Sequence, residues 1–127
     1  MAKPVPVITI DGHVGSGKGT ISQFLANKLG WHYLESGALY RILALVAERE
    51  QIDLDNEDAL TELALHLEVE FISQTKTSPA KILLKKQDVT LTIRQETIGT
   101  MASKISAFLK VRGALLKRQK DFLKFPG

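Results

Sequence analysis

The sequence has no cysteine among its 127 residues, few aromatic side chains and no long apolar run. Without cysteine there is no disulfide, no thiolate metal ligand and no thiol nucleophile. No apolar stretch approaches the ~20 residues that span a bilayer. The short apolar stretch near the N-terminus runs into Asp11 and Gly12, unlike a signal peptide. We therefore expect a cytoplasmic protein that does not associate with membranes.

The charged residues are present in ordinary amounts but are unevenly placed. The composition, 44% apolar and 24% charged, is typical of a globular protein and excludes a disordered or collagen-like chain. Nine acids and one base lie between Glu48 and Glu70, whereas twelve bases and three acids lie from Lys76 onward. The basic half favours solvated helix faces or cations gathered around a small phosphorylated ligand. A nucleic-acid surface is the third alternative.

The first fifty residues alternate between strand and helix patterns. Val5–Ile10 and Trp31–Leu34 are short apolar runs typical of strands, and Gly30 ends a helix over Lys18–Leu29. Ser36 is expected to cap a second helix. The apolar faces of the two helices are formed by Ile21, Phe24, Leu25 and Leu29, and by Leu39, Ile42, Leu43 and Val46. This order predicts the opening of a parallel α/β sheet flanked by helices.

The pattern changes after the second helix. Asp55 or Asn56 can cap a short helix, and apolar residues then alternate with polar ones at Val69 and Phe71, Ile82 and Leu84, and Val89 and Leu91. That alternation predicts a small antiparallel meander, which we interpret as a subdomain inserted into the α/β pattern. Helical spacing returns at Arg94, and a long final helix carries Phe108, Val111, Leu115 and Phe122.

The most specific motif is a glycine-rich loop between the first expected strand and helix. It consists of Gly12, His13, Val14, Gly15, Ser16, Gly17, Lys18, Gly19 and Thr20. Glycines let successive backbone N–H groups turn inward to form an anion nest at a helix N-terminus. The Lys18 ammonium can follow charge on the β- and γ-phosphates during transfer. A glycine-rich turn with a coincidental lysine is the alternative, which the strand–loop–helix context disfavours.

One position departs from the strict phosphate-loop pattern. Gly19 stands where Ser or Thr usually ligates Mg²⁺, and the hydroxyl comes one residue later at Thr20. We infer that Mg²⁺ would be held mainly by the phosphates and water, and that Thr20 donates to a phosphate oxygen. His13 is interpreted as a loop residue whose backbone matters more than its ring. The sequence predicts no set of side-chain metal ligands.

Three motifs together resemble the bacterial cytidylate kinases over essentially the whole chain. They are the GxxGxGKGT loop, the segment Trp31–Arg41, and the later elements Ile93-Arg94, Ala102-Ser103-Lys104 and Val111–Leu116. Glu35 stands where that family usually has Asp. The resemblance implies a P-loop nucleoside monophosphate kinase fold. It divides the chain into a P-loop core with acceptor helix (1–66), an inserted monophosphate-binding β subdomain (67–93) and helices returning to the core (94–127).

The resemblance also implies roles for individual residues. Gly12 through Thr20 would hold the ATP phosphates, with Lys18 as the catalytic residue. The acceptor nucleotide would be bound by Ser36, Tyr40, Arg41, Arg94, Ser103 and Arg112. Within that set, Ser36 and Arg41 would bind the phosphate with support from Arg94, Tyr40 would pack near the base, and Ser103 and Arg112 would contact the cytosine edge.

The implied activity is transfer of the γ-phosphoryl group of ATP to CMP or dCMP, with Mg²⁺ and without a nucleic-acid or membrane partner. Past a motif like Lys124–Gly127, the family continues into an Asp-Gly-Arg-Asp element and a lid. We therefore expect the fold to be incomplete, as the N-terminal portion of a longer enzyme that is a monomer. Two alternatives stay open: another P-loop kinase of a small molecule, and a non-catalytic module that binds ATP or phosphate.

Overall fold

The computed structural model describes residues 5–10, 18–72 and 81–122, except for the side chains of residues 18–20. Residues 1–4, 11–17, 73–80 and 123–127 lie outside this description. The described elements, in chain order, are α1 (Lys18–Leu29), α2 (Ser36–Arg49), α3 (Glu57–Leu65), β1 (Val69–Ile72), β2 (Lys81–Leu84), β3 (Gln87–Asp88), the short 3₁₀-helix η1 (Thr92–Arg94), α4 (Glu96–Ile105) and α5 (Leu109–Lys120). None of the described helices is both long enough and apolar enough to cross a bilayer.

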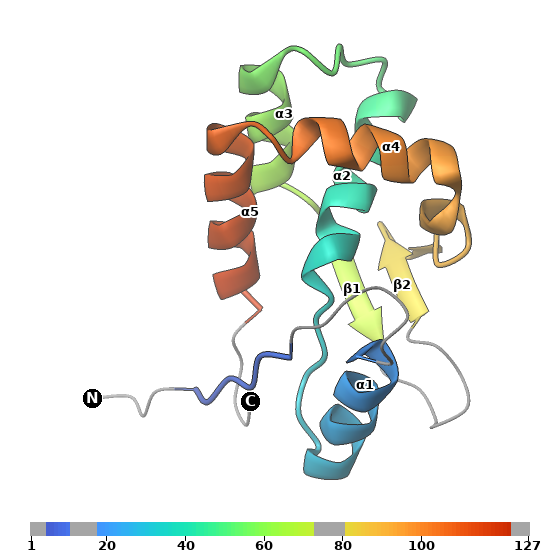
Figure 1. The fold of residues 1–127 in the computed structure, drawn as a ribbon, viewed down its shortest axis with the longest axis vertical. Coiled ribbons are helices and arrows are strands. Elements are labelled where there is room, and N and C mark those ends of the chain that lie inside the picture. The colour runs from blue at the N-terminus through green and yellow to red at the C-terminus, as the bar shows by residue number, and fades with distance from the viewer. Residues whose placement is uncertain (1–4, 11–17, 73–80, 123–127) are drawn as a thin grey trace.

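Helix α2 lies at the centre of the fold (Figure 1). Helix α4 crosses α2, and α3 pairs with α5 beside it. The predicted apolar face of α2 is confirmed, since Leu39, Ile42 and Leu43 are fully buried. Ala44 and Leu45 are buried as well, so α2 is enclosed on more than one side. The middle of α2 is therefore held in place by its neighbours, whereas its two ends are exposed.

The helix ends follow local sequence signals in one case and depart from them in another. Asn56 caps α3 as predicted, because its side-chain oxygen accepts a hydrogen bond of 3.1 Å from the Ala59 N–H. The prediction that Ser36 caps α2 is wrong. Glu35 is the capping residue and makes no side-chain capping bond, while Ser36 is the first helical residue. The cap position is thus set one residue earlier than the hydroxyl suggested.

The antiparallel meander is confirmed as a three-stranded sheet in the order β1-β2-β3. Val69 faces Leu84 and Phe71 faces Ile82 across the first pair of strands, which places Val69, Leu84 and Ile82 in the core. The third strand is shorter and earlier than predicted, at Gln87–Asp88. The residues predicted for it are split, because Val89 is buried whereas Leu91 is 81% exposed.

The turn between β2 and β3 is strained. Lys85 and Lys86 both have positive φ, at 48° and 66°, as a two-residue hairpin of type I′ requires. Residues other than glycine, asparagine and aspartate rarely adopt this left-handed conformation, because their Cβ atom comes too close to the backbone. We expect replacement of the pair by Asn-Gly to raise the free energy of unfolding by about 1–2 kcal/mol in urea titrations. Lys85→Ala removes a charge but keeps the strain, so an equal gain in that variant would refute this explanation.

The two parallel strands predicted near the N-terminus are not confirmed. Residues 5–10 and 31–34 carry no regular secondary structure, and Val7 and Ile8 are 58% and 53% exposed. Both segments border a hollow of about 610 Å³ that also touches α1, β1 and α5. A strand is stable only with hydrogen-bonded neighbours, and neither segment pairs with a strand among the described residues.

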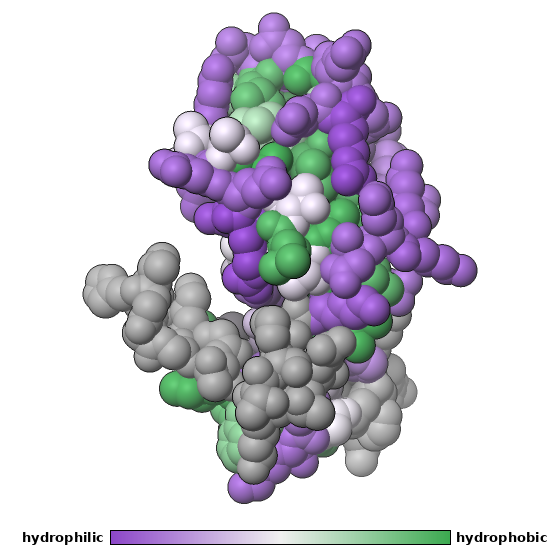
Figure 2. Space-filling model, turned by 90° about the vertical axis from the view of Figure 1, so that its right-hand side faces the viewer, coloured by the Kyte–Doolittle hydropathy of each residue, from purple (hydrophilic) through white to green (hydrophobic). Residues whose placement is uncertain are grey.

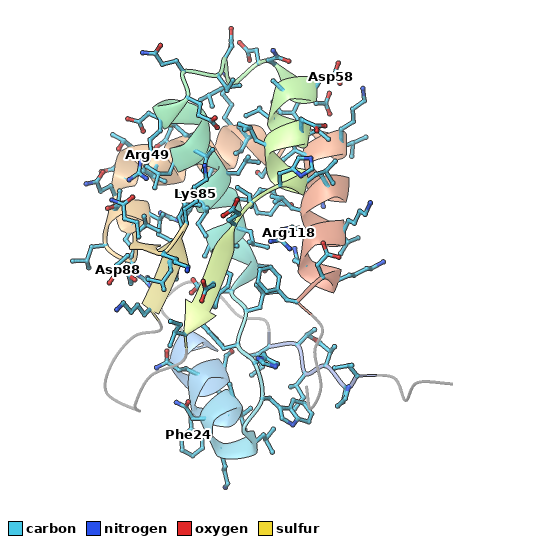
Figure 3. All side chains as sticks on the ribbon, turned by 180° about the vertical axis from the view of Figure 1, so that it is seen from behind. Phe24, Arg49, Asp58, Lys85, Asp88 and Arg118 are labelled. Carbon is cyan, nitrogen blue, oxygen red and sulfur yellow. The ribbon has the colours of Figure 1, made fainter. Side chains whose placement is uncertain are left out.

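Helix α1 has the predicted bounds, and much of its apolar face is exposed. Gly30, with a φ of +67°, ends it in the left-handed conformation that glycine readily adopts. Three of the four residues on its predicted apolar face, Ile21, Phe24 and Leu29, are 51%, 37% and 44% exposed. Phe24 points away from the rest of the fold (Figure 3).

The uneven distribution of charge along the sequence is partly balanced in space. Lys104 pairs with Asp55 at 3.2 Å, and Lys110 pairs with Asp58 at 3.0 Å. Arg118 points from α5 toward the chain before β1 (Figure 3), where its guanidinium donates to the Leu67 carbonyl. Much of the upper part of the face in Figure 2 is hydrophilic. These bases of the second half, on α4 and α5, therefore contact the segment from Asp55 to Leu67.

Candidate functional site

The predicted phosphate loop is only partly described by the structure. Gly12, His13, Val14, Gly15, Ser16 and Gly17 lie outside the described residues, as do the side chains of Lys18 and Thr20. The backbone shows that α1 begins at Lys18, with no acidic residue in its first turn. The loop therefore leads directly into a helix N-terminus whose partial positive charge no carboxylate of that turn offsets.

Arg41 connects the central helix to η1. Its Nη1 donates a hydrogen bond of 2.9 Å to the carbonyl oxygen of Ile93, which is buried. Ile93 lies 52 residues further along the chain, and the next residue is the exposed Arg94. This one bond therefore fixes the Arg41 guanidinium beside the segment that carries the second arginine.

A basic hollow lies where α2, η1 and α4 meet. Its volume is about 600 Å³, and its lining residues are Arg41, Arg94, Glu96, Gly99, Thr100, Ser103 and Lys104. Three cations and one carboxylate line it, although Lys104 is also paired with Asp55, and two side chains carry hydroxyl groups. Guanidinium groups bind phosphate oxygens with paired N–H donors. These residues suit a small phosphorylated ligand. The name basic hollow is used below for the cavity that they line.

The structure brings together three of the six predicted acceptor residues, Arg41, Arg94 and Ser103, in the basic hollow. Ser36 is exposed at the start of α2 and borders the larger hollow instead. Tyr40 is half-buried against the apolar core. Arg112 is exposed on α5 and lines neither hollow. η1 and α4 follow one another in the chain, whereas Arg41 on α2 is distant from both in sequence.

Four residues that line the basic hollow were given no role from the sequence, although one of them, Lys104, belongs to a quoted motif; they are Glu96, Gly99, Thr100 and Lys104. Together with Ser103 they recur at intervals of three and four along α4, which places them on one face of a helix. That spacing was available as a signal once a helix over this segment was expected. What it could not indicate is which neighbour the face meets.

Tyr33 and Glu35 form a pair just before α2. The Tyr33 hydroxyl donates to Glu35 Oε2 at 3.4 Å. Burial, followed by the charge and hydrogen bond of Glu35, raises the pKa of Tyr33 to about 12, although the charge of Arg94 acts in the opposite direction. Arg94 therefore lies within electrostatic reach of this pair. Its positive charge acts both in the basic hollow and on the Tyr33–Glu35 pair before α2.

The raised pKa of Tyr33 predicts a loss of stability at high pH. The ordinary value is 10.0 and the folded value is about 12, so the folded state retains a proton that the unfolded chain loses. The contribution is complete below pH 10 and is lost as the pH rises to about 12. The ultraviolet titration curve of Tyr33→Phe is subtracted from that of the wild type. The difference curve should show a phenolate midpoint well above pH 10. A difference curve centred near 10 would contradict the assignment.

Comparison with known proteins decides the family. A family model described as "Cytidylate kinase" matches residues 8–127. The chain belongs to the cytidylate kinase family. Cytidylate kinases of Shewanella frigidimarina and Shewanella pealeana are 51% and 50% identical to it, and that of Stutzerimonas stutzeri is 54% identical, each over 127 residues. These matches cover 100% of this chain but 55–56% of the relatives, so the chain spans a little over half of their length.

Membership of the cytidylate kinase family agrees with the resemblance seen in the motifs and implies the P-loop nucleoside monophosphate kinase fold. Members of such a family use ATP with Mg²⁺. Among the described residues, no group of three or more His, Cys, Asp or Glu side chains could hold a metal ion. The loop sequence offers hydroxyl groups at Ser16 and Thr20 and no carboxylate beyond Asp11. These donors fit a cation that arrives with its nucleotide.

Proposed function

We propose that this chain provides the ATP loop and the acceptor site of a kinase that transfers the γ-phosphoryl group of ATP to CMP or dCMP. The observation that carries the proposal is the basic hollow, where Arg41, Arg94 and Ser103 from α2, η1 and α4 meet. The family membership supports the same reaction. The products would be ADP and the corresponding nucleoside diphosphate.

The phosphate loop would bind ATP. Backbone N–H groups of residues 12–17 and the first turn of α1 would hold its phosphates, and the Lys18 ammonium would follow the charge that develops on the transferred group. Mg²⁺, bound with the phosphates and water, would supply charge neutralisation. The residues of the chain would then position the γ-phosphoryl group for in-line attack by an oxygen of the acceptor phosphate.

The basic hollow would bind the acceptor nucleotide. Arg41 and Arg94 would hold its phosphate, which reduces repulsion between the attacking oxygen and the ATP phosphates. Ser103 would meet the cytosine edge, where an unpaired amine or carbonyl would be costly in a closed site. Ser36 and Tyr40, near the start of α2, would complete the site. Arg112 stays a sequence-based prediction, because its exposed position on α5 gives the proposed base contact no support.

We also propose a more detailed fold for the complete core. Residues 5–10 and 31–34 would be parallel strands of the P-loop sheet, and residues 67–93 would be the inserted acceptor-binding subdomain. Two observations support this arrangement. The two strand-like segments border the same hollow, and the antiparallel sheet lies wholly within 69–88. A parallel sheet completed by further strands would also cover the exposed face of α1.

Calorimetry with matched ligands tests the acceptor site. CMP and cytidine differ only in the phosphate, so we expect the chain to bind CMP at least ten times more tightly if arginines of the basic hollow hold that group. Equal affinity for CMP and cytidine would contradict the proposal. Binding of ATP without any binding of CMP would favour the non-catalytic module. Preference for another phosphorylated acceptor would favour a different P-loop kinase.

A further inference from the structure

Gly99 lies on α4 directly against the guanidinium of Arg41. A methyl group added at Gly99 would approach Arg41 Nη2 to 3.0 Å, Nη1 to 3.1 Å and Cζ to 3.3 Å. These distances are shorter than ordinary van der Waals contact between carbon and nitrogen or carbon. The guanidinium therefore occupies space that any other residue at this position would fill.

The backbone of Gly99 does not itself require glycine. Its φ is not in the positive region, since among the described glycines only Gly30 has a positive φ. It is the fourth residue of α4, and alanine is a better helix former than glycine at such a position. Gly113 provides the contrast: it is also helical, yet a methyl group there would meet nothing within 4 Å. Close approach of Arg41 is thus the structural feature that distinguishes Gly99.

The same guanidinium is also held by η1. Nη1 donates to the Ile93 carbonyl at 2.9 Å, which uses one of the five N–H donors of the group. Gly99 and Arg41 both line the basic hollow. A side chain at Gly99 would push the guanidinium, the flexible end of Arg41, rather than the helix backbone. The bond to Ile93 and the place of the charge in the hollow would change together.

We infer that Gly99 is a positioning residue for the acceptor phosphate, because its missing side chain lets Arg41 lie against α4 while bonded to Ile93. This inference rests on the proposed function for its consequence in binding. Its structural part, the placement of Arg41 by Gly99, stands independently of any ligand. Gly99→Ala should therefore displace the charge while leaving the helix at least as stable.

The test compares Gly99→Ala with the matched variant Gly113→Ala. Both replace a helical glycine by alanine, so both should unfold at the same or a higher urea concentration than wild type. The Arg41 Nε–H signal in ¹H–¹⁵N spectra, assigned by its loss in Arg41→Lys, should shift in Gly99→Ala and stay in place in Gly113→Ala. Affinity for CMP should fall about tenfold or more in Gly99→Ala, while affinity for ATP stays unchanged.

Each outcome decides a different statement. An unshifted Arg41 signal in Gly99→Ala, or an equal loss of CMP affinity in Gly113→Ala, would overturn the inference. A shifted signal with unchanged CMP affinity would also overturn it, because the moved guanidinium would then have no part in binding. Absence of CMP binding by wild type would refute the proposed function, while the Arg41 signal would still decide whether Gly99 places that side chain.

Discussion

Replacement of Lys18 by alanine is expected to lower the rate of phosphoryl transfer from ATP to CMP by a factor of about 100 to 1,000. In the proposed reaction, negative charge moves along the β- and γ-phosphates as the bond to ADP breaks, and the Lys18 ammonium offsets it. Alanine cannot do so. Alanine also favours helix formation, so α1 should still begin at this position. The measurement is ADP formation with ATP, Mg²⁺ and CMP.

Lys28→Ala is the matched control for this experiment. Lys28 lies in the last turn of the same helix, with its Nζ 5.9 Å from the centre of the Phe24 ring. It is ten residues, or about 15 Å along the axis, from Lys18. Its loss should leave turnover within twofold of wild type. Comparable losses in the two variants would point to a general effect of charge on α1 and would refute the role of Lys18.

Replacement of Leu60 by alanine is expected to lower the free energy of unfolding by about 2–5 kcal/mol. Leu60 is fully buried on α3, which packs against α5 and α2. Removing most of its side chain loses burial and leaves a cavity that the surrounding helices fill incompletely. Urea unfolding followed by circular dichroism measures the change, with the slope of the transition checked for two-state behaviour.

Leu109→Ala makes the same chemical change where no such loss is expected. Leu109 is 78% exposed at the start of α5, so the variant should differ from wild type by no more than about 0.5 kcal/mol. If the two leucine variants were equally destabilised, the packing of α3 into the core would be described wrongly. The arrangement of α2 and α4 that forms the basic hollow would then lose its structural basis.

The parts of the fold that the sequence predicted well depend on short-range interactions. Asn56 caps α3 by bonding to Ala59, three residues away, and Gly30 ends α1 through its own backbone conformation. The burial of Leu39 and Ile42 follows from helical spacing in an apolar stripe. The β1–β2–β3 meander follows from alternation over neighbouring segments. In each case the deciding partner is close in sequence.

The parts that were predicted incorrectly or not at all depend on distant partners. The apolar run 5–10 has the composition of a strand, but composition does not supply the neighbouring strand that would pair with it. Without that sheet, Phe24 and Ile21 on α1 are left exposed. Local spacing placed both residues on one apolar face of α1, but spacing alone does not show what covers that face.

The candidate site divides in the same way. The glycine-rich motif indicated a phosphate loop because its residues are consecutive, and family resemblance brought Arg41, Arg94 and Ser103 together in one hypothesis. The proximity of Gly99 to Arg41 could not be predicted from spacing, because it arises where α4 crosses α2, 58 positions apart in the chain. Arg112 shows the converse: its motif suggested a base contact, but α5 leaves its side chain exposed.

Turnover with a panel of acceptors tests the central claim most directly. The protein is mixed with ATP and Mg²⁺ and, in separate reactions, with CMP, dCMP, UMP or AMP, and each nucleoside diphosphate is measured. The account predicts diphosphate formation with CMP and dCMP at rates well above those with UMP and AMP, because the acceptor site would pair polar groups with the cytosine edge. Equal turnover of CMP and UMP, or ATP binding with no transfer to any acceptor, would contradict it.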